Sequence, residues 1–309
     1  MRKETIFSMS SPCRDDFRIT AFRFGSGRRT VAVVGSMRGD EIQQQYVASQ
    51  LVARLTEMEA AGSLAPDNEI MVIPSINSFS LNVGKRFWPL DNTDINRMFP
   101  GYDRGETTQR IAAAVFEAIK DFEYGIQLAS FYMPGDFIPH VRMMQTGFED
   151  IDDARTFGLP YVCIRKPTPY DTTLLNYNWQ IWNTKAFSIY AGRRNAIDVN
   201  DTSLIIRSML RFMDKAGALT CPDNSARFLS EVIYERDLVH IKPIGSGLFR
   251  PFKCPGDEVQ PGEPMGVITD ALDGHLLETV HSPCAGTVFF VSNNPLVLES
   301  NMLFRINPQ

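Results

Sequence analysis

The chain has 309 residues, 44% of them hydrophobic and 22% charged, which is the composition of a globular protein with enough apolar material for a sizeable core. Its formal net charge of −5 excludes a global basic field, so neither nucleic acid nor an anionic membrane surface is expected as a partner. Any anion site must therefore be built locally.

The cysteines and the N-terminal segment indicate the compartment. The five cysteines are odd in number, widely spaced and never in a C-x-x-C pair, which argues against a disulfide framework or a thiolate zinc site. The first 16 residues lack the continuous apolar stretch of a secretory signal. No apolar run approaches the roughly 18 residues of a membrane span. We therefore expect a cytoplasmic protein with free thiols.

The first predicted elements alternate between strand and helix. Residues 17–24 alternate apolar and polar side chains, as a half-buried antiparallel strand does, and 30–35 form the continuous apolar run of a buried strand. Residues 41–61 have helical periodicity, and 69–77 form another buried strand. The apolar stripe expected on the helix consists of Ile42, Tyr46, Ser49 or Gln50, Ala53 and Met58. A strand, helix, strand order implies a right-handed crossover and a parallel or mixed sheet.

The same alternation continues to about residue 220. The further predicted elements are a helix at 106–122, strands at 124–130, 158–165 and 186–192, and a helix at 201–219. Asp201 and Thr202 supply N-cap chemistry for the last helix. Strands and helices that alternate in this way indicate a three-layer α/β domain.

The composition changes after residues 221–227, the turn-rich segment CPDNSAR. We therefore predict two domains, 1–225 and 226–309, the second made of short strands between turns. Within it a GD-x-V-x-x-G pattern matches a small all-β barrel-sandwich similar to a lipoyl or biotinyl carrier domain. The residues of this pattern are Gly256, Asp257, Val259 and Gly262. Carriers present a modifiable lysine at a hairpin tip, but Lys242 and Lys253 lie outside such a hairpin, so cofactor carriage is not expected.

One long segment resembles a known family. Residues 77–101, NSFSLNVGKRFWPLDNTDINRMFPG, resemble the R-F-x-P…D-x-N-R-x-F-P-G segment of the succinylglutamate desuccinylase and aspartoacylase family. A G-x-x-x-G-D-E stretch precedes it at 35–41, and the strand YGIQLASF follows at 124–131, where the family has an I-D-L-H-S strand. The resemblance implies a zinc carboxypeptidase-like fold, here a three-layer mixed-sheet domain followed by the lipoyl-like one. It also implies hydrolysis of an acyl or amide bond next to a carboxylate.

The metal positions of that family are changed in this chain. The resemblance implies that zinc is held by a histidine, a glutamate three residues later and a histidine on a later strand, which correspond here to Arg38, Glu41 and Ala129. The aspartate before the second histidine is Gln127. Neither a guanidinium nor a methyl group has a lone pair to donate to a metal, so only Glu41 could act as a ligand. A catalytic zinc needs three protein ligands. No metal or other cofactor is therefore expected.

The candidate catalytic groups are Glu41, Tyr190 and His140. Tyr190 stands where the resemblance implies the catalytic glutamate, but an unperturbed tyrosine titrates near pH ~10, too high for a general base at neutrality. His140 follows the strand of the former ligand and is either a proton shuttle at the pocket rim or a hydrogen-bonded core residue. His240, His275 and His281 lack ligand spacing and are expected at the surface or in turns.

The arginines of residues 77–101, the segment that resembles the family, suggest recognition of a carboxylate. The resemblance implies that Arg86, Asn96 and Arg97 grip the substrate's carboxylate, and a guanidinium suits it because it offers a two-bond fork. With Arg38 they would form an anion pocket. Two alternatives stay open: Arg97 forms an ion pair with Asp94 or Asp91, or Arg38 simply neutralises Glu41.

Aromatic residues gather near the predicted cleft and either line it or pack beneath it. They are Phe87, Trp88, Phe131, Tyr132, Tyr170, Tyr177, Trp179 and Trp182. Three functions remain: a hydrolase of the family, a catalytically silent protein that binds a small-molecule or peptide carboxylate, and a scaffold. The oligomeric state stays open, a homo-oligomer included.

Overall fold

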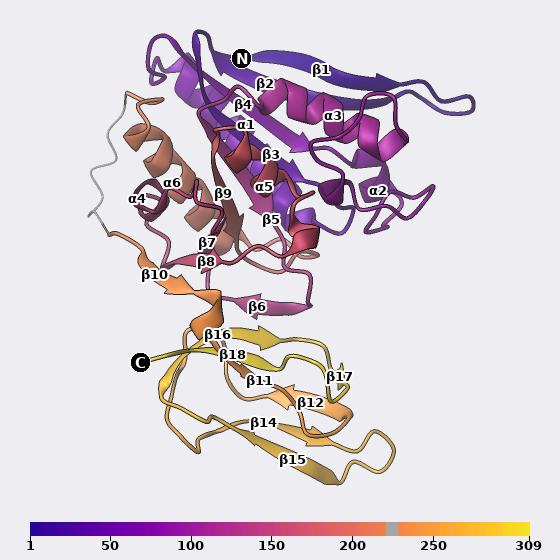
Figure 1. Ribbon diagram of the computed structural model, residues 1–309, viewed down its shortest axis with the longest axis vertical. Helices are drawn as coiled ribbons and strands as arrows, with labels where there is room; N and C mark the ends of the chain where they lie inside the picture. Colours follow the sequence, from indigo (N-terminus) through magenta and orange to yellow (C-terminus); the bar gives the residue numbers. More distant parts are fainter. Residues whose placement is uncertain (221–227) are drawn as a thin grey trace.

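The computed structural model describes residues 1–220 and 228–309, and it contains two bodies (Figure 1). The upper body is a large sheet with helices, and the lower body consists of short strands. The predicted linker 221–227 lies outside the described residues. Among the described residues, no helix has both the length and the apolar character to cross a membrane.

The large sheet has nine strands in the order β1-β2-β4-β3-β5-β9-β7-β8-β10. Their bounds are β1 (Arg2–Met9), β2 (Phe17–Gly25), β3 (Arg28–Ser36), β4 (Asn68–Ser75), β5 (Tyr124–Ala129), β7 (His140–Met144), β8 (Tyr161–Arg165), β9 (Lys185–Tyr190) and β10 (Glu231–Tyr234). The central strands β4, β3, β5 and β9 are mutually parallel, and β7 runs antiparallel to β9. The predicted mixed sheet is confirmed, and its central strands are mostly apolar because helices cover both faces.

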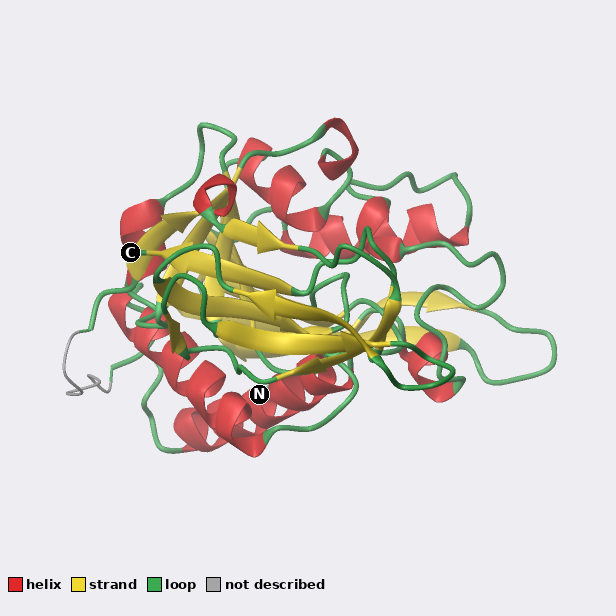
Figure 2. Cartoon of the chain, turned by 90° about the horizontal axis from the view of Figure 1, so that it is seen from below, coloured by secondary structure: helices red, strands yellow, loops and turns green. Residues whose placement is uncertain are grey.

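Helices pack on both faces of the sheet and make three layers, as Figure 2 shows. One face carries α1 (Ile42–Ala60), α4 (Ile151–Arg155) and α6 (Val199–Lys215). The other carries α3 (Thr107–Ile119) and α5 (Leu175–Ile181), while the short α2 (Ser78–Asn82) follows β4. The predicted three-layer α/β architecture is confirmed.

Two local predictions are wrong, and one strand was not predicted. The N-cap of α6 is Asp198, whose carboxylate accepts from the backbone N–H groups of Asn200 and Asp201, so this helix starts before the predicted cap pair. Strand β1 was not predicted because its side chains are exposed or only partly buried and lack apolar alternation. The buried stripe of α1 consists of Gln43, Gln44, Val47, Ala48, Leu51 and Leu55, not of the predicted residues. Helix α1 faces the sheet with this stripe, and Ile42 is 36% exposed.

The C-terminal body is a small all-β sandwich, as predicted. One sheet has the order β11-β18-β16-β13, and the other has the order β15-β14-β12-β17. Their bounds are β11 (Val239–Ile241), β12 (Gly247–Pro251), β13 (Glu258–Val259), β14 (Pro264–Thr269), β15 (Leu276–His281), β16 (Gly286–Ser292), β17 (Leu296–Val297) and β18 (Phe304–Pro308). A core that includes Val259, Met265, Val288 and Phe304 lies between them.

The two bodies share strands and core. Strand β10 pairs in parallel with β8, so it belongs to the large sheet although it follows the predicted boundary at 225/226. Strand β6 (Gly135–Phe137), which lies between β5 and β7 in the chain, instead pairs with β16 of the C-terminal body. Phe131 and Phe290 pack together in one buried cluster at this seam. Composition marks a turn-rich segment but carries no information on strand partners, which is why the sequence missed this exchange.

Candidate ligand-binding site

The site lies where the parallel strands β3, β5 and β9 end together. The pairing places Val34 beside Gln127 and Ala129 beside Tyr190, so the loops that follow these strands meet at one edge of the sheet. A cavity of about 600 Å³ opens there. Gly39 lets the loop after β3 pack closely, because a Cβ at this position would lie 2.1 Å from the carbonyl oxygen of Lys85.

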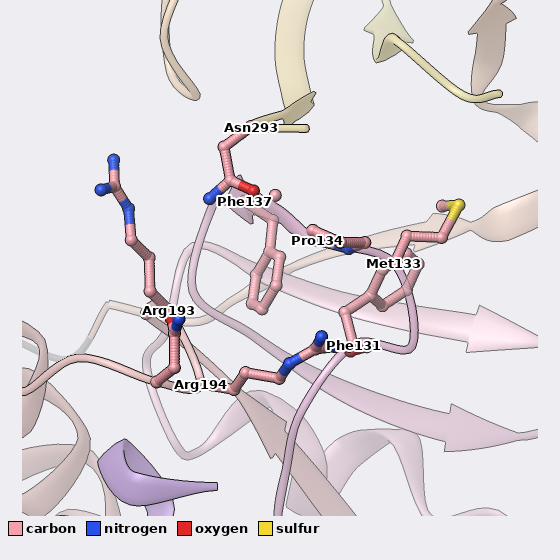
Figure 3. A pocket seen from close by; sticks show the side chains of 10 residues that line it. Phe131, Met133, Pro134, Phe137, Arg193, Arg194 and Asn293 are labelled. Carbon is pink, nitrogen blue, oxygen red and sulfur yellow. Dashed lines mark hydrogen bonds between the residues drawn. The ribbon is translucent and has the colours of Figure 1, made fainter. Parts of the chain in front are cut away.

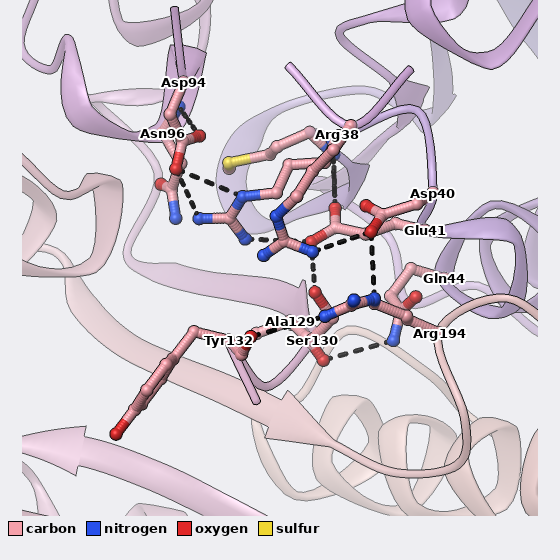
Figure 4. A network of polar contacts seen from close by, with 12 residues as sticks. Arg38, Asp40, Glu41, Gln44, Asp94, Asn96, Ala129, Ser130, Tyr132 and Arg194 are labelled. Atoms are coloured by element: carbon pink, nitrogen blue, oxygen red, sulfur yellow. Dashed lines mark hydrogen bonds and ion pairs between the residues drawn. The ribbon is translucent and has the colours of Figure 1, made fainter. Parts of the chain in front are cut away.

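Arg38 lies between two carboxylates (Figure 4). Its Nη1 donates to Glu41 Oε1 at 2.9 Å, and its Nη2 donates to Asp94 Oδ2 at 2.8 Å. Burial alone would lower the pKa of Arg38, but the charges of Glu41 and Asp94 outweigh burial and raise the pKa above its ordinary value. Arg38 is therefore a permanent cation whose charge is neutralised inside the protein. The predicted pair of Arg38 and Glu41 forms, with Asp94 as a further partner.

Glu41 is only 1% exposed and accepts four hydrogen bonds. Besides Arg38 Nη1, the donors are the backbone N–H of Met37 at 2.8 Å, the backbone N–H of Arg38 at 3.1 Å and Ser130 Oγ at 2.5 Å. These contacts use both carboxylate oxygens, so neither is left open to a metal or a substrate.

The side chains around Glu41 do not fit zinc. Ala129 has no donor atom, and Gln127 donates its side-chain amide to Met37 Sδ at 3.5 Å. Arg38 would place a fixed positive charge beside a dication. In the described part of the chain, one cluster of three ligand-type side chains exists: Asp270, Asp273 and His275, which follow β14 in the C-terminal body. This cluster is remote from the cavity by its place in the fold, and we assign it no role.

Arg86 does not join the predicted anion pocket. Its Nη1 donates to Asp40 Oδ2 at 2.7 Å, and Arg194 forms an ion pair with the same oxygen, with its Nε at 2.9 Å. Burial is the main cause that lowers the pKa of Arg194, and the positive charge of Arg86 lowers it further. The pairing holds Arg86 on Asp40 and outside the cavity wall, so the predicted trio of Arg38, Arg86 and Arg97 must be corrected.

Asn96 and Arg97 do line the cavity, from the single turn η1 (Ile95–Arg97). Asn96 is buried, and its Oδ1 accepts from the backbone N–H of Leu175 at 3.4 Å, which ties this turn to α5. Arg97 donates to the Tyr170 carbonyl at 3.1 Å, and its nearest carboxylate, Asp94, is 3.9 Å away. The long ion pair with Asp94 is the alternative foreseen for Arg97, and it leaves the Arg97 side chain 44% exposed.

Tyr190 lines the cavity, whereas His140 lies behind it. The two rings stack with centroids 5.3 Å apart, and His140 Nδ1 is 2.8 Å from the carbonyl oxygen of Ile138, to which it donates when neutral. His140 is 2% exposed, and burial is the main cause that lowers its pKa to about 3. The core alternative for His140 matches this position, whereas a proton shuttle at the rim does not.

His140 makes folding sensitive to acid. Its folded-state pKa of about 3 lies below the ordinary 6.5, so the unfolded chain binds this proton first. The stability contribution is fully present above pH 6.5 and is lost as the pH falls toward 3. We expect His140→Phe to remove about 2 kcal/mol of the stability lost between pH 7 and pH 5, measured by urea unfolding. The surface control His281→Phe should keep the acid sensitivity of the parent; equal sensitivity in all three proteins would contradict the prediction.

The aromatic residues divide between packing and lining. Trp88 and Trp179 are fully buried, and Trp182 packs on Phe116 with centroids 5.4 Å apart. Phe131, Tyr132 and Tyr170 line the cavity instead. A smaller cavity of about 100 Å³ lies between Phe131, Arg194 and Asn293 (Figure 3), and it is too small for most organic ligands.

The sequence missed a second group of cavity residues. Arg142 on β7, Arg165 at the end of β8 and Arg305 on β18 converge on Glu235. Arg165 ends a predicted strand and could have been found. Arg142 and Arg305 carry no sequence signal, because β7 was not predicted and β18 belongs to the other body.

The fold and the cavity together define a two-part α/β protein with a candidate ligand site at the strand ends. The model of the succinylglutamate desuccinylase/aspartoacylase catalytic domain matches residues 27–215. The chain therefore belongs to the succinylglutamate desuccinylase/aspartoacylase family.

Solved structures show the same fold over nearly the whole chain. A succinylglutamate desuccinylase/aspartoacylase from Rhodobacter sphaeroides is 20% identical, with 94% of this chain and 89% of that chain covered and a TM-score of 0.77. A succinylglutamate desuccinylase from Silicibacter sp. is 15% identical, with 98% and 92% covered and a TM-score of 0.79. The product-bound ectoine utilization protein EutE (DoeB) from Ruegeria pomeroyi is 17% identical, with 99% and 93% covered and a TM-score of 0.77.

One curated relative is similar over a shorter segment. The N-alpha-acetyl-L-2,4-diaminobutyric acid deacetylase of Halomonas elongata is 29% identical over 94 residues. These residues make up 30% of this chain and 25% of that protein. The chain thus matches about a quarter of the relative's length.

Proposed function

We propose that this chain is a metal-independent member of its family that binds a carboxylate-bearing ligand, an N-acyl amino acid or a peptide end. The observation that carries the proposal is the ion pair of Arg38 with Glu41 and Asp94. It occupies the position of the first histidine ligand and uses the one remaining zinc ligand, Glu41. Without a bound metal, the cavity keeps its capacity to recognise a ligand.

Arg97 and Asn96 are the groups that would hold the ligand's carboxylate. Arg97 is half exposed in the cavity wall, and its carboxylate partner Asp94 is 3.9 Å away, which leaves room for a closer anion. Tyr132 and Tyr170 are 66% and 65% exposed beside it and would contact the acyl or peptide portion. A cavity of about 600 Å³ has the size of a small-molecule site.

The alternative function is hydrolysis of an amide bond. It is supported by membership of the family and by the name of the Halomonas elongata deacetylase. A metal-free reaction would need a base, and the candidates are Glu41 and Tyr190. Glu41 would have to leave four hydrogen-bond donors before it could accept a proton, which makes binding the better supported function.

Titration calorimetry with N-acetylated amino acids tests the proposal, together with metal analysis of the purified protein. We expect Arg97→Gln to weaken binding at least about tenfold, because a charge-assisted fork to the carboxylate is lost. Arg104→Gln, at an exposed arginine outside the cavity wall, should leave the affinity unchanged. Stoichiometric zinc in the parent protein, or turnover that a chelator abolishes, would overturn the proposal in favour of hydrolysis.

A further inference from the structure

Three guanidinium groups share one carboxylate at the seam between the two bodies. Glu235, in the turn η3 (Glu235–Asp237), lies 2.6 Å from Arg142 Nη2, 2.9 Å from Arg305 Nη1 and 3.3 Å from Arg165 Nε. Arg165 has one further partner, Asp171, at 2.6 Å. We call Arg142, Arg165, Arg305 and Glu235 the seam cluster. It forms one wall of the cavity that also contains Arg97.

The cavity carries an excess of positive charge. Its cationic side chains, apart from the exposed Arg236 that pairs with Asp237, are Arg38, Arg97, Arg142, Arg165, Lys166 and Arg305. The carboxylates that line it or pair with these cations are Glu41, Asp94, Asp171 and Glu235. Six cations against four carboxylates leave two positive charges without a counterpart in a chain whose net charge is −5.

The seam cluster keeps buried donors without partners. The side chains of Arg142 and Arg305 are 11% and 6% exposed. Among the described residues, the Nε of each has no hydrogen-bond partner. Both guanidinium groups lie near the ring of Phe131, at 5.6 Å and 5.1 Å from its centroid, which fixes them in place. Buried charges and unpaired donors are unfavourable unless an anion accepts from them.

We propose that the seam cluster is an anion subsite that binds a doubly negative oxyanion group of the cavity's ligand. The proposal rests on the proposed function in one respect, that the ligand occupies this cavity. Arg97 then holds one carboxylate, and the seam cluster holds a second, dianionic group such as a phosphate or a dicarboxylate. A monocarboxylate at Arg97 alone would leave the seam cluster, in which three guanidinium groups face Glu235 and Asp171, with a positive charge that has no counterpart.

The position of the subsite gives the C-terminal body a part in binding. Arg305 comes from β18 of the sandwich, while Arg142 and Arg165 come from β7 and β8 of the large sheet. An anion that accepts from all three would connect the two bodies. Its binding should therefore raise the unfolding temperature of the full chain.

The test measures binding of inorganic phosphate and of succinate to the full chain, with acetate at equal ionic strength as the monovalent control. We expect phosphate or succinate to bind at least tenfold more tightly than acetate. The comparison of phosphate with succinate identifies the chemical source of the dianion. Arg305→Gln should weaken dianion binding tenfold or more. Arg165→Gln changes a more accessible side chain and should also weaken dianion binding tenfold or more. It takes the place of Arg305→Gln in the test if that variant does not fold.

Glu235→Gln distinguishes an anion subsite from a purely structural ion cluster. It removes the shared carboxylate, so an anion subsite should bind phosphate several-fold more tightly, and phosphate should restore most of the lost unfolding temperature. Burial and the charge of Arg305 lower the pKa of the neighbouring His240, so a bound dianion should raise it, observable by NMR. Equal affinity for acetate and both dianions, or no response of Glu235→Gln to phosphate, would overturn the proposal.

The same panel separates this proposal from the proposed function. N-acetylglycine should lose affinity in Arg97→Gln and keep it in Arg305→Gln, whereas phosphate should behave in the opposite way. Binding of phosphate without binding of any N-acetyl amino acid would refute the proposed function and support the subsite. The reverse result would refute the subsite alone.

Discussion

Replacing Arg38 with alanine is expected to lower the free energy of unfolding by about 3–5 kcal/mol. The substitution leaves the carboxylate of Glu41, which is 1% exposed, without its cationic partner. It also removes the nearer of the two cationic partners of Asp94, whose side chain is 12% exposed, and leaves Arg97 at 3.9 Å. A buried carboxylate that loses its counter-charge is costly because its charge is then compensated only by hydrogen bonds. Urea unfolding at pH 7 measures the change.

The matched control for this prediction is the double variant Arg38→Ala/Glu41→Gln. A neutral amide at position 41 can still accept from the backbone N–H groups of Met37 and Arg38. We expect it to recover at least about half of the lost free energy. If Arg38→Ala alone has no effect on stability, the ion pair contributes little, and Arg38 is instead available to a ligand.

The second large effect is expected from Arg38→His/Ala129→His. This double variant supplies two imidazoles around Glu41, the three-ligand set that a zinc site with one open position requires. We expect about one zinc per chain, and zinc at 100 times its dissociation constant should raise the stability by about 2.7 kcal/mol. Metal analysis after gel filtration and thermal unfolding with and without chelator measure both quantities.

The control for zinc binding is the same double variant with Glu41→Gln, which should lose the metal. Either single substitution supplies too few ligands and should also stay without zinc. Failure of the double variant to bind zinc would mean that the backbone at the ends of β3 and β5 no longer has the geometry of a metal site. The proposed function would then rest on a changed backbone in addition to changed side chains.

The cavity belongs to both bodies of the protein. Arg97 comes from the turn η1 that follows α2, and Arg305 comes from the last strand of the chain. Because β6 pairs with β16 and the cluster around Phe131 fills the seam, the C-terminal body is held against the cavity. This arrangement places Arg305 and His240 of the small all-β body in the wall of the cavity.

Much of the large domain could be predicted from local sequence. Central strands such as β3 are continuous apolar runs because both faces are covered, and α3 has a clear amphipathic period. Strands β1 and β7 were missed because exposed or short segments carry little periodicity. The buried stripe of α1 was misassigned because Gln43 and Gln44 are polar residues buried against other segments, Gln44 on the Ala129 carbonyl.

The sequence by itself determined that the side chains of Arg38 and Ala129 are no metal ligands, since a guanidinium and a methyl group cannot donate electron pairs wherever they lie. It also determined the alternation that builds the sheet. Only the tertiary structure decided which arginines line the cavity. Arg86 pairs with Asp40 instead, whereas Arg305 of the C-terminal body lines the cavity. The physical reason is that side-chain chemistry is local, whereas ion-pair partners are chosen by distances between segments that chain order does not specify.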